Sequence, residues 1–367
     1  MCTAAELRLA RMALTFGIDA RAAAEVPAGR GRVVREVLAA LARLDGDERY
    51  LLYCREPAEL ELDERFEWRA VDRPDPLWHL DTARRAARQC AAFLSTNSYL
   101  TAWFTRVPCA VMVYDLVPFI AGAQAQKRAT WIEKATIDVG VRRARALVCI
   151  SDATRRDLVE RVPSSAPRAL VIPLAAAELF GAAGRARRGS ERPYVLAAGT
   201  LEPRKNLERL LDAWARLAPA LRDAHDLVLV GPAGWEADAI LRRARGAGVR
   251  VTGYVPDEEL AALYGGCEVF CYPSLYEGFG LPVLEAMRAG APVITSNVSS
   301  LPEVAGDAAV LVDPLSVDAI RGALARLLAD PDERARLREA GRARAAGFSW
   351  ERTASELRDV LRRLGGR

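Results

Sequence analysis

The sequence predicts an α/β protein made of two Rossmann-like domains that face each other across a cleft. The chain has 367 residues, which is about two domains of ordinary length. Apolar, strand-like segments alternate with amphipathic, helix-like segments along most of it, and this alternation is typical of parallel βαβ units. It is interrupted once, at 182–193, where small, polar and arginine residues indicate a linker.

The first domain is expected over residues 1–181, of which 1–11 form a dispensable extension. Apolar, β-rich composition predicts its strands, at 12–18, 50–54, 107–114, 144–150 and 169–173. A glycine loop, Gly29-Arg30-Gly31, follows the first strand and leads into an amphipathic helix at 33–44. Ser151-Asp152 is expected to cap a further helix that runs to Val162. The alternation predicts a parallel sheet with helices on both faces.

The second domain is expected over residues 194–348. Its strands are predicted at 194–198, 227–230, 249–252, 269–272, 293–295 and 309–312, and its helices at 206–218, 237–247, 257–264 and 282–289. Pro282 is expected at the first position of the last of these helices, which Gly290 ends. Two long helices, near 316–345 and 350–363, complete the chain. Ligands of such sheets bind at the carboxyl ends of the strands, so the cleft is the expected ligand site.

The composition is that of a globular protein and argues against several other classes. Lys and Arg number 52 against 48 Asp and Glu, 51% of residues are hydrophobic and 27% are charged, unlike a disordered chain. No run approaches the roughly 20 apolar residues of a spanning helix, and Glu6, Arg8 and Arg11 interrupt the start where a signal peptide would be apolar. We therefore expect neither an integral membrane protein, nor a fibre, nor a small disulfide scaffold.

Cysteine and histidine usage indicates a reducing compartment and no metal centre. Seven cysteines occur without a C-x-x-C pair, at positions 2, 54, 90, 109, 149, 267 and 271. Their odd number favours buried free thiols and a cytoplasmic protein. The two histidines, His79 and His225, lack the spacing of metal ligands.

Charge is distributed unevenly between the halves. Residues 1–188 carry 29 basic and 23 acidic side chains, whereas residues 189–367 carry 23 and 25. Solvated, arginine-rich helix faces are one interpretation. The other is a peripheral contact of the first domain with an anionic partner, such as the inner face of a membrane or a lipid-linked phosphate. Nothing resembles the basic, aromatic-interleaved stripe of a nucleic-acid-binding protein.

The strongest functional signal is the segment 276–287, which reads Tyr-Glu-Gly-Phe-Gly-Leu-Pro-Val-Leu-Glu-Ala-Met. Its two glycines directly precede a helix, whose first backbone N–H groups are free to bind an anion. Glu277 on the loop and Glu285 in the helix are expected to reach the same pocket. Carboxylates beside a phosphate would repel it unless they accept hydrogen bonds, and the hydroxyls of a sugar or ribose are suitable donors. The structural alternative is a capping Glu277 and a surface Glu285.

The second signal is Glu202-Pro203-Arg204-Lys205-Asn206, which follows the predicted strand 194–198 and Gly199-Thr200. Cations at the start of a helix oppose its dipole and require a reason, and a diphosphate at the end of the strand would supply one. Lys205 is one of only three lysines among 52 basic residues, which favours a specific use of its compact charge. The alternative is a solvated helix start.

With these motifs the chain resembles the retaining glycosyltransferases of family 4, which have the GT-B fold. Glu277 to Glu285 matches the E-x7-E element of that family, and 199–206 resembles its donor-phosphate segment. Further matching segments are 254–256, 299–304 and, more patchily, 29–32, 114–118, 150–152 and 348–352. The resemblance implies that 349–367 form a last helix that crosses back to the first domain.

The resemblance also implies roles for individual residues. Arg204 and Lys205 would hold the donor diphosphate, Glu285 the ribose hydroxyls, and Glu277 would lie against the donor sugar. The other implied donor contacts are Gly29, Arg30, Gly31, Gly199, Thr200, Tyr254, Val255, Pro256, Gly278, Phe279, Gly280 and Leu281. The subgroup that the chain most resembles transfers mannose from GDP-mannose to a glycan or lipid-linked acceptor during assembly of cell-surface polysaccharides.

One position departs from the family pattern. Many members have His-Asp where this chain has Tyr114-Asp115, which we keep as candidate catalytic residues. Tyr114 can exchange hydrogen bonds but cannot become a cation. A UDP-sugar donor and a non-catalytic nucleotide-sugar-binding or regulatory protein therefore stay open as alternatives. A dinucleotide-dependent oxidoreductase is disfavoured, because Val34 stands where the third glycine of G-x-G-x-x-G is required.

No metal cofactor is expected. The two D-x-D strings, Asp45-Gly46-Asp47 and Asp330-Pro331-Asp332, follow predicted helix ends and are typical of turns. The cations Arg204 and Lys205, together with the helix start, are expected to stabilise the leaving diphosphate instead.

Overall fold

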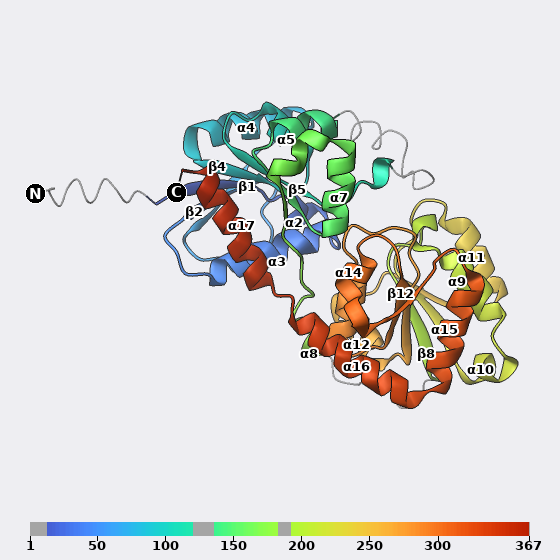
Figure 1. The fold of residues 1–367 in the computed structure, drawn as a ribbon. Coiled ribbons are helices and arrows are strands. Elements are labelled where there is room, and N and C mark those ends of the chain that lie inside the picture. Colours follow the sequence, from blue (N-terminus) through green and yellow to red (C-terminus); the bar gives the residue numbers. More distant parts are fainter. Residues whose placement is uncertain (1–12, 120–135, 183–191, 367) are drawn as a thin grey trace, which may run out of the picture.

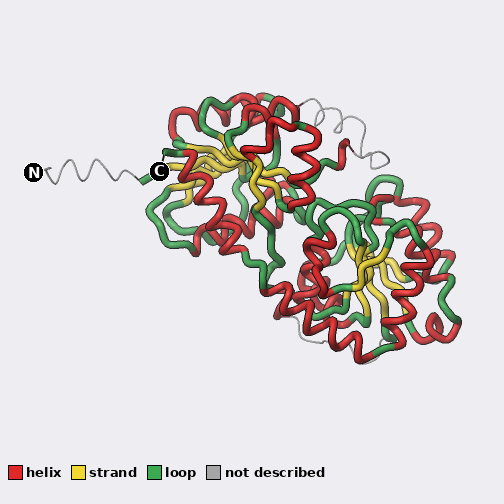
Figure 2. Tube along the Cα trace, in the orientation of Figure 1, coloured by secondary structure: helices red, strands yellow, loops and turns green. Residues whose placement is uncertain are grey.

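The computed structural model describes residues 13–119, 136–182 and 192–366. The predicted extension and most of the predicted linker lie outside these ranges. Two lobes are visible, each with its strands gathered at the centre and helices around them (Figures 1 and 2). The prediction of an α/β protein with two Rossmann-like sheets is confirmed. No helix among the described residues is long and apolar enough to cross a membrane.

The first sheet has seven parallel strands in the order β3-β2-β1-β4-β5-β6-β7. Their bounds are β1 Thr15–Asp19, β2 Arg49–Cys54, β3 Phe66–Ala70, β4 Ala92–Ser95, β5 Cys109–Val113, β6 Ala146–Cys149 and β7 Ala169–Val171. The order reverses between β1 and β4, which pair in parallel from Phe16 opposite Ala92. The crevice beyond this reversal is where such sheets bind ligands.

Helices cover both faces of the first sheet, as the buried strands at its centre, β4, β5 and β6, require. One face packs against α3 (Arg30–Arg43), which lies beside the C-terminal helix α17 (Trp350–Leu364). The other face packs against α4 (Leu77–Gln89), α5 (Tyr99–Phe104) and α7 (Asp152–Arg161). Short elements complete the domain: α2 Arg21–Glu25, η1 Val117–Phe119 and η2 Pro163–Arg168. The position of α17 on α3 is the crossing back that the resemblance implies (Figure 1).

The second sheet has six parallel strands in the order β10-β9-β8-β11-β12-β13. Their bounds are β8 Tyr194–Ala198, β9 Asp226–Val230, β10 Arg250–Gly253, β11 Val269–Tyr272, β12 Val293–Ser296 and β13 Val310–Val312. One face carries α9 (Leu207–Ala215), α11 (Ala237–Gly246) and α15 (Val317–Ala329). The other carries α12 (Asp257–Gly266), α13 (Leu281–Ala289) and α14 (Leu301–Ala305). The remaining elements are η3 Pro203–Lys205, α10 Pro219–Ala224, η4 Gly306–Ala308 and α16 Pro331–Ala346.

The apolar core on one face of each sheet is continuous across the domain boundary. It runs from Phe16 and Leu38 of the first domain through Phe180 to Val283 of the second. Phe180 belongs to α8 (Leu179–Ala182), which packs against α12 and α13. The packing of the second domain therefore begins before residue 182, earlier than the predicted linker.

Three local predictions are wrong. Arg30 and Gly31 are the first residues of α3 and not loop residues, since Gly29 alone precedes the helix with φ of 56°. Pro282 is the second residue of α13, which starts at Leu281. The long helix expected at 316–345 is two helices that meet at Asp330, because a proline at 331 cannot continue the hydrogen-bond ladder.

Candidate active site

A cavity of about 370 Å³ opens between the domains at the carboxyl ends of both sheets. The turns after β8, β9, β10 and β11 and the start of α13 line it from the second domain. The first domain contributes the start of α3 and the end of β5. This size and position are those of a small-molecule site at a topological switch point.

A set of charged and polar side chains near the end of β11 lies at the cavity, and all of its members except Glu202 line it. We call Glu202, Arg204, Lys205, Tyr272 and Glu277 the Glu277 cluster. Lys205 Nζ lies 2.7 Å from Glu277 Oε1, and Arg204 Nη1 lies 2.8 Å from Oε2. Tyr272 donates its hydroxyl to Oε1 at 2.8 Å, and Lys205 in turn donates to Tyr272. The two sequence motifs, separated by about seventy residues in the chain, therefore meet around one carboxylate.

Electrostatics keeps this carboxylate ionised. Burial alone would raise the pKa of Glu277, but Lys205 and Arg204 outweigh it and lower the pKa to about 2. The ammonium of Lys205 has three N–H donors, and two acceptors, Tyr272 and Glu277, are found for them among the described residues. One donor of Lys205 is left for a ligand in the cavity that it lines.

The backbone around η3 explains why the cations reach Glu277. Pro203–Lys205 form a single tight turn, which ends at Asn206 in the left-handed conformation with φ of 59°. The Asn206 side chain donates to the carbonyls of Pro273 and Pro314, at 2.9 and 2.7 Å. The amide of Leu275 donates to the Arg204 carbonyl at 2.9 Å. The turn is thus tied to the loop that carries Glu277.

The start of α13 offers backbone donors to the same cavity. Within the described residues, the N–H groups of Gly278, Phe279, Gly280 and Leu281 have no hydrogen-bond partner. All four residues line the cavity. Free N–H groups at the positive end of a helix bind phosphate or another anion. This geometry is compatible with the predicted anion site, which stays a prediction.

Glu285 lies at the other end of the cavity and is paired across the cleft. Arg32, on α3 of the first domain, donates to Glu285 and to Asp257 of the second domain. Tyr264 lies within 3.4 Å of the second Glu285 oxygen. Burial raises the pKa of Glu285 and Arg32 only partly offsets this. An arginine of the first domain therefore pairs with the carboxylate that the resemblance assigns to a ribose.

The first domain brings the predicted Tyr114 and Asp115 to the cavity, in different ways. The ring of Tyr114 lines the cavity below the guanidinium of Arg30, which lies 5.4 Å from the ring centroid. Its hydroxyl donates to the sulfur of Met112 at 3.7 Å, and burial raises the pKa of the phenol. Asp115 caps the amide of Val117 at 3.1 Å. The Tyr114 hydroxyl is thus engaged by a buried side chain of its own domain.

Most of the predicted donor contacts line the cavity, and two do not. Gly199, Thr200, Tyr254 and Val255 do so, whereas Gly31 and Pro256 are absent from the lining. Gly31 has a packing role instead, because a Cβ there would lie 1.7 Å from the Val26 carbonyl oxygen.

Sequence reasoning missed Arg32, Asp257 and Tyr272. Arg32 had a readable signal: a charged residue on the otherwise apolar face of α3, where Val33, Val34 and Val37 are buried. A buried arginine needs an oppositely charged partner, but the sequence around Arg32 does not indicate which residue that is.

The D-x-D strings and the six cysteines among the described residues lie outside the cavity. Asp330 caps α16 through the amide of Glu333 at 2.8 Å, as turn chemistry predicts, and neither string lines the cavity. No group of three potential ligands that could hold a metal is found in the described residues. Burial raises the pKa of the Cys267 thiol to about 12, so it stays protonated.

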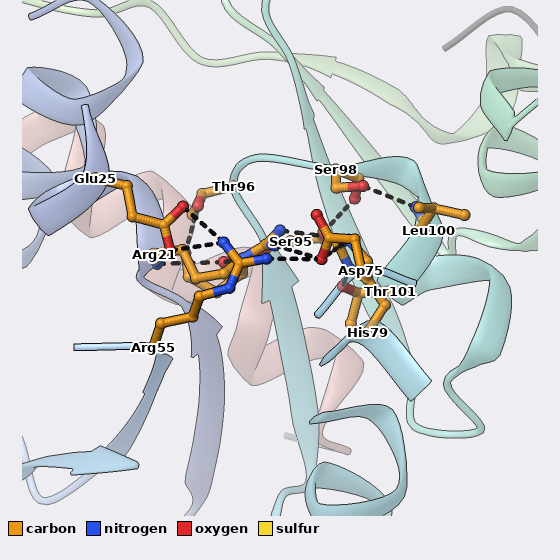
Figure 3. Close-up of polar contacts among 11 residues, drawn as sticks. Arg21, Glu25, Arg55, Asp75, His79, Ser95, Thr96, Ser98, Leu100 and Thr101 are labelled. Atoms are coloured by element: carbon orange, nitrogen blue, oxygen red, sulfur yellow. Dashed lines mark hydrogen bonds and ion pairs between the residues drawn. The ribbon is translucent and has the colours of Figure 1, made fainter. Parts of the chain in front are cut away.

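A second polar cluster, buried except for the exposed Asp75, lies at the carboxyl end of β1. We call Asp19, Arg21, Asp75, His79 and Thr101 the β1 cluster, and Figure 3 labels each of them except Asp19. Arg21 donates to both oxygens of Asp19 and to Asp75, each at 3.2 Å, and His79 lies 2.8 Å from the Thr101 hydroxyl. None of the five residues lines the cavity between the domains.

Comparison with known proteins identifies the second domain. Residues 184–344 match the family described as Glycosyl transferases group 1. Over 175 residues the chain is 45% identical to O-antigen chain mannosyltransferase B of Escherichia coli, a match that covers 47% of this chain and 46% of the relative. Over 219 residues it is 38% identical to the MMP alpha-(1->4)-mannosyltransferase of Mycolicibacterium hassiacum, covering 57% and 52%. The chain spans about half the length of these two curated relatives.

Solved structures match over nearly the whole chain. Sucrose-phosphate synthase from Thermosynechococcus elongatus superposes with a TM-score of 0.77 at 22% identity, covering 96% of this chain and 99% of that one. WaaG, a glycosyltransferase involved in lipopolysaccharide biosynthesis, superposes with a TM-score of 0.73 at 17% identity, covering 95% and 99%. The fold is therefore GT-B, as predicted.

Proposed function

We propose that this chain, which carries a glycosyl transferases group 1 domain, is a retaining glycosyltransferase. It moves mannose from GDP-mannose to a glycan or lipid-linked acceptor in the synthesis of a cell-surface polysaccharide. Support for mannose comes from relatives whose names call them mannosyltransferases, one of O-antigen chains and one of MMP. Support for a nucleotide donor comes from the cavity itself.

One observation carries the proposal: the Glu277 cluster borders the four free N–H groups at the start of α13. Cations and backbone amides together suit a leaving diphosphate, which they stabilise as its negative charge grows. A carboxylate held ionised suits the opposite charge, which develops on the sugar ring. The residues at hand thus match the charge separation of glycosyl transfer, and they do so without a metal ion.

Retention would follow from a front-face reaction. The bond between the anomeric carbon and the diphosphate oxygen breaks, and the acceptor oxygen forms a new bond to that carbon on the same face. A diphosphate oxygen takes the proton of the acceptor hydroxyl. The protein supplies positioning and electrostatic stabilisation in this scheme. Glu285 would accept hydrogen bonds from the ribose once Arg32 has released it.

If the acceptor is lipid-linked, the first domain must reach the membrane that carries it. A lipid-linked acceptor would bring this domain to the inner face of a membrane, where its excess of basic residues favours a peripheral contact. Sedimentation with vesicles that contain an anionic lipid tests this contact, and it should weaken as salt is raised.

A nucleotide-sugar panel tests the proposed function. The chain is incubated with GDP-mannose, GDP-glucose, UDP-glucose and ADP-glucose, first in thermal-shift assays and then with product detection. Ligand at one hundred times its dissociation constant should add about 2.7 kcal/mol of stability. Release of GDP from GDP-mannose supports the proposal, whereas turnover of a UDP-sugar alone would reassign the donor.

A binding protein without catalysis is the second candidate, because the Tyr114 hydroxyl is engaged by Met112 and not by the cavity. A nucleotide sugar that stabilises the protein but is neither transferred nor hydrolysed would favour it. The Tyr114→His variant then shows whether the residue usual in the family restores turnover.

A further inference from the structure

We propose that Ser151 and Thr154, at the start of α7 in the first domain, are positioning residues for the donor loop of the second domain. They hold the carbonyl of Gly278 and so fix the orientation of the peptide that follows Glu277. The inference rests on the proposed function, because it assigns these hydroxyls to the site where the donor reacts.

Both hydroxyls reach across the cleft to one carbonyl oxygen. Ser151 Oγ donates to Gly278 O at 2.6 Å, and Thr154 Oγ1 donates to the same atom at 3.0 Å. Both side chains are fully buried. Ser151 also caps α7 by accepting from the Thr154 amide at 3.0 Å, which fixes the two hydroxyls side by side.

Because the peptide unit is planar, the direction of the Gly278 carbonyl also fixes the direction of the N–H group that follows it. In a trans peptide the C=O of one residue and the N–H of the next point in opposite directions. A Gly278 carbonyl held toward α7 therefore directs the Phe279 N–H away from α7. That N–H has no partner among the described residues, and Phe279 lines the cavity. The first domain thus sets the direction of one of the backbone donors proposed for the ligand.

The two neighbouring carbonyls are held from within the second domain. Ser300 Oγ lies 2.9 Å from the Glu277 carbonyl oxygen and 2.8 Å from that of Phe279. Only the middle carbonyl, that of Gly278, depends on the other domain. Separation of the domains would release this peptide, so loop geometry and domain closure are coupled.

Other contacts show that α7 is docked against this loop and its neighbours. Glu303 of α14 accepts from the amide of Asp152 at 2.8 Å and from that of Ala153 at 3.2 Å. Tyr276 donates its hydroxyl to Asp157 at 2.6 Å. At position 278 a Cβ would lie 1.8 Å from the Tyr114 carbonyl oxygen, so only glycine permits this approach.

The kinetic test removes each hydroxyl without changing the size of the side chain greatly. Thr154→Val and Ser151→Ala should each lower kcat about threefold to tenfold, the worth of one hydrogen bond, with less than about a twofold change in the donor KM. Thr154→Ser keeps the hydroxyl and should retain wild-type kcat. Ser165→Ala is the matched control, because Ser165 is buried in the same domain with no partner for its hydroxyl in the described residues.

The readouts separate positioning from simple loss of stability. Wild-type kcat in both Thr154→Val and Ser151→Ala would overturn the proposal, as would a kcat that falls equally in Thr154→Ser. A crystal structure of the unliganded double variant keeps the inference testable whether or not the chain turns over a nucleotide sugar. We expect the Gly278 carbonyl to have turned away from α7 in it. A carbonyl still directed at α7 would refute the inference and leave the proposed function standing.

Discussion

The carboxyl ends of the two sheets each hold a largely buried cluster of ion pairs, and the clusters differ in what surrounds them. In the β1 cluster the Arg21 guanidinium is bonded to Asp19 and Asp75 and stacks 3.8 Å from the centre of the Trp78 ring. In the Glu277 cluster the charges are paired equally well. Only the second cluster, however, lines the cavity and borders unpaired backbone N–H groups in the described residues.

This difference shows which feature marks a ligand site. Buried ion pairs alone do not, because such pairs occur wherever a charge has been enclosed and must be neutralised. Hydrogen-bond donors that lack a protein partner inside a cavity do mark a ligand site. A buried donor without a partner is costly, so a ligand or water is expected to accept its hydrogen bond. The predictions below test whether the two clusters differ in function as they differ in geometry.

The largest expected effect is that of Glu277→Gln. The amide keeps the shape of the side chain but loses the charge that would face a developing positive charge on the sugar. We expect kcat to fall about a hundredfold, as for the loss of other preorganised electrostatic groups, with a smaller change in KM. Steady-state kinetics with saturating acceptor measures this, and Glu258→Gln, an exposed acid on α12, is the control. Changes confined to donor affinity would reduce Glu277 to a binding group.

Lys205→Met should act on both rate and pH dependence. Loss of the contact to the leaving diphosphate should lower kcat about tenfold or more. In the wild type Lys205 helps to lower the pKa of Glu277 to about 2. Without it, burial should raise that pKa, so the acid limb of the pH–rate profile moves to higher pH. An unchanged acid limb would show that Lys205 does not control Glu277.

Glu285→Gln is expected to act through binding. Hydrogen bonds from the ribose form in both the bound substrate and the transition state, so their loss raises the donor KM and leaves kcat nearly unchanged. About a tenfold rise is expected for bonds to a charged group. A matching fall in kcat would contradict the separate roles of the two carboxylates.

The second domain could be predicted from the sequence better than the first. β8 and β11 have the predicted bounds because each is an apolar run between polar or turn residues. β3, β4, α4 and α5 were all missed. β3 is an edge strand whose residues are only partly buried or exposed. Its apolar residues Phe66, Trp68 and Ala70 alternate with the charged Glu67 and Arg69, so this short run did carry a strand signal that was overlooked.

The site shows the same limit. The pairing of Arg204 and Lys205 with Glu277 follows from two motifs that each carry a strong local signal. The pairing of Arg32 with Glu285 joins residues 253 positions apart. No sequence motif around Arg32 indicates which residue it contacts. Long-range contacts of this kind depend on how two domains close, which local sequence patterns do not specify.

A smaller effect, on stability alone, is expected at His79 of the β1 cluster. Burial, aided by Arg21, lowers the pKa of His79 to about 4 despite the opposing charges of Asp19 and Asp75. The unfolded chain binds this proton below pH about 6.5, whereas the folded protein does so only near pH 4. The wild type should therefore lose about 2 kcal/mol of stability as pH falls from 7 to 4.5.

Urea denaturation at the two pH values checks this, with turnover measured in parallel. His79→Asn should flatten the pH dependence of stability, and His225→Asn, which removes the other histidine, should not. Turnover of His79→Asn at pH 7 should stay close to that of the wild type. A large loss of kcat would place the β1 cluster in the reaction and erase the contrast with the Glu277 cluster.

The smallest expected effect is that of a chelator, for which we predict none. The charge on a leaving diphosphate must be met by some positive group, and Arg204, Lys205 and the start of α13 already converge on the cavity. Neither D-x-D string lines the cavity. Asp330 caps α16 by accepting from the Glu333 amide, and Asp45 follows the end of α3. Turnover should therefore survive EDTA and gain nothing from added Mg²⁺ or Mn²⁺. If a divalent ion proved essential, the carboxylates of the cavity, Glu277 first, would have to be tested as its ligands.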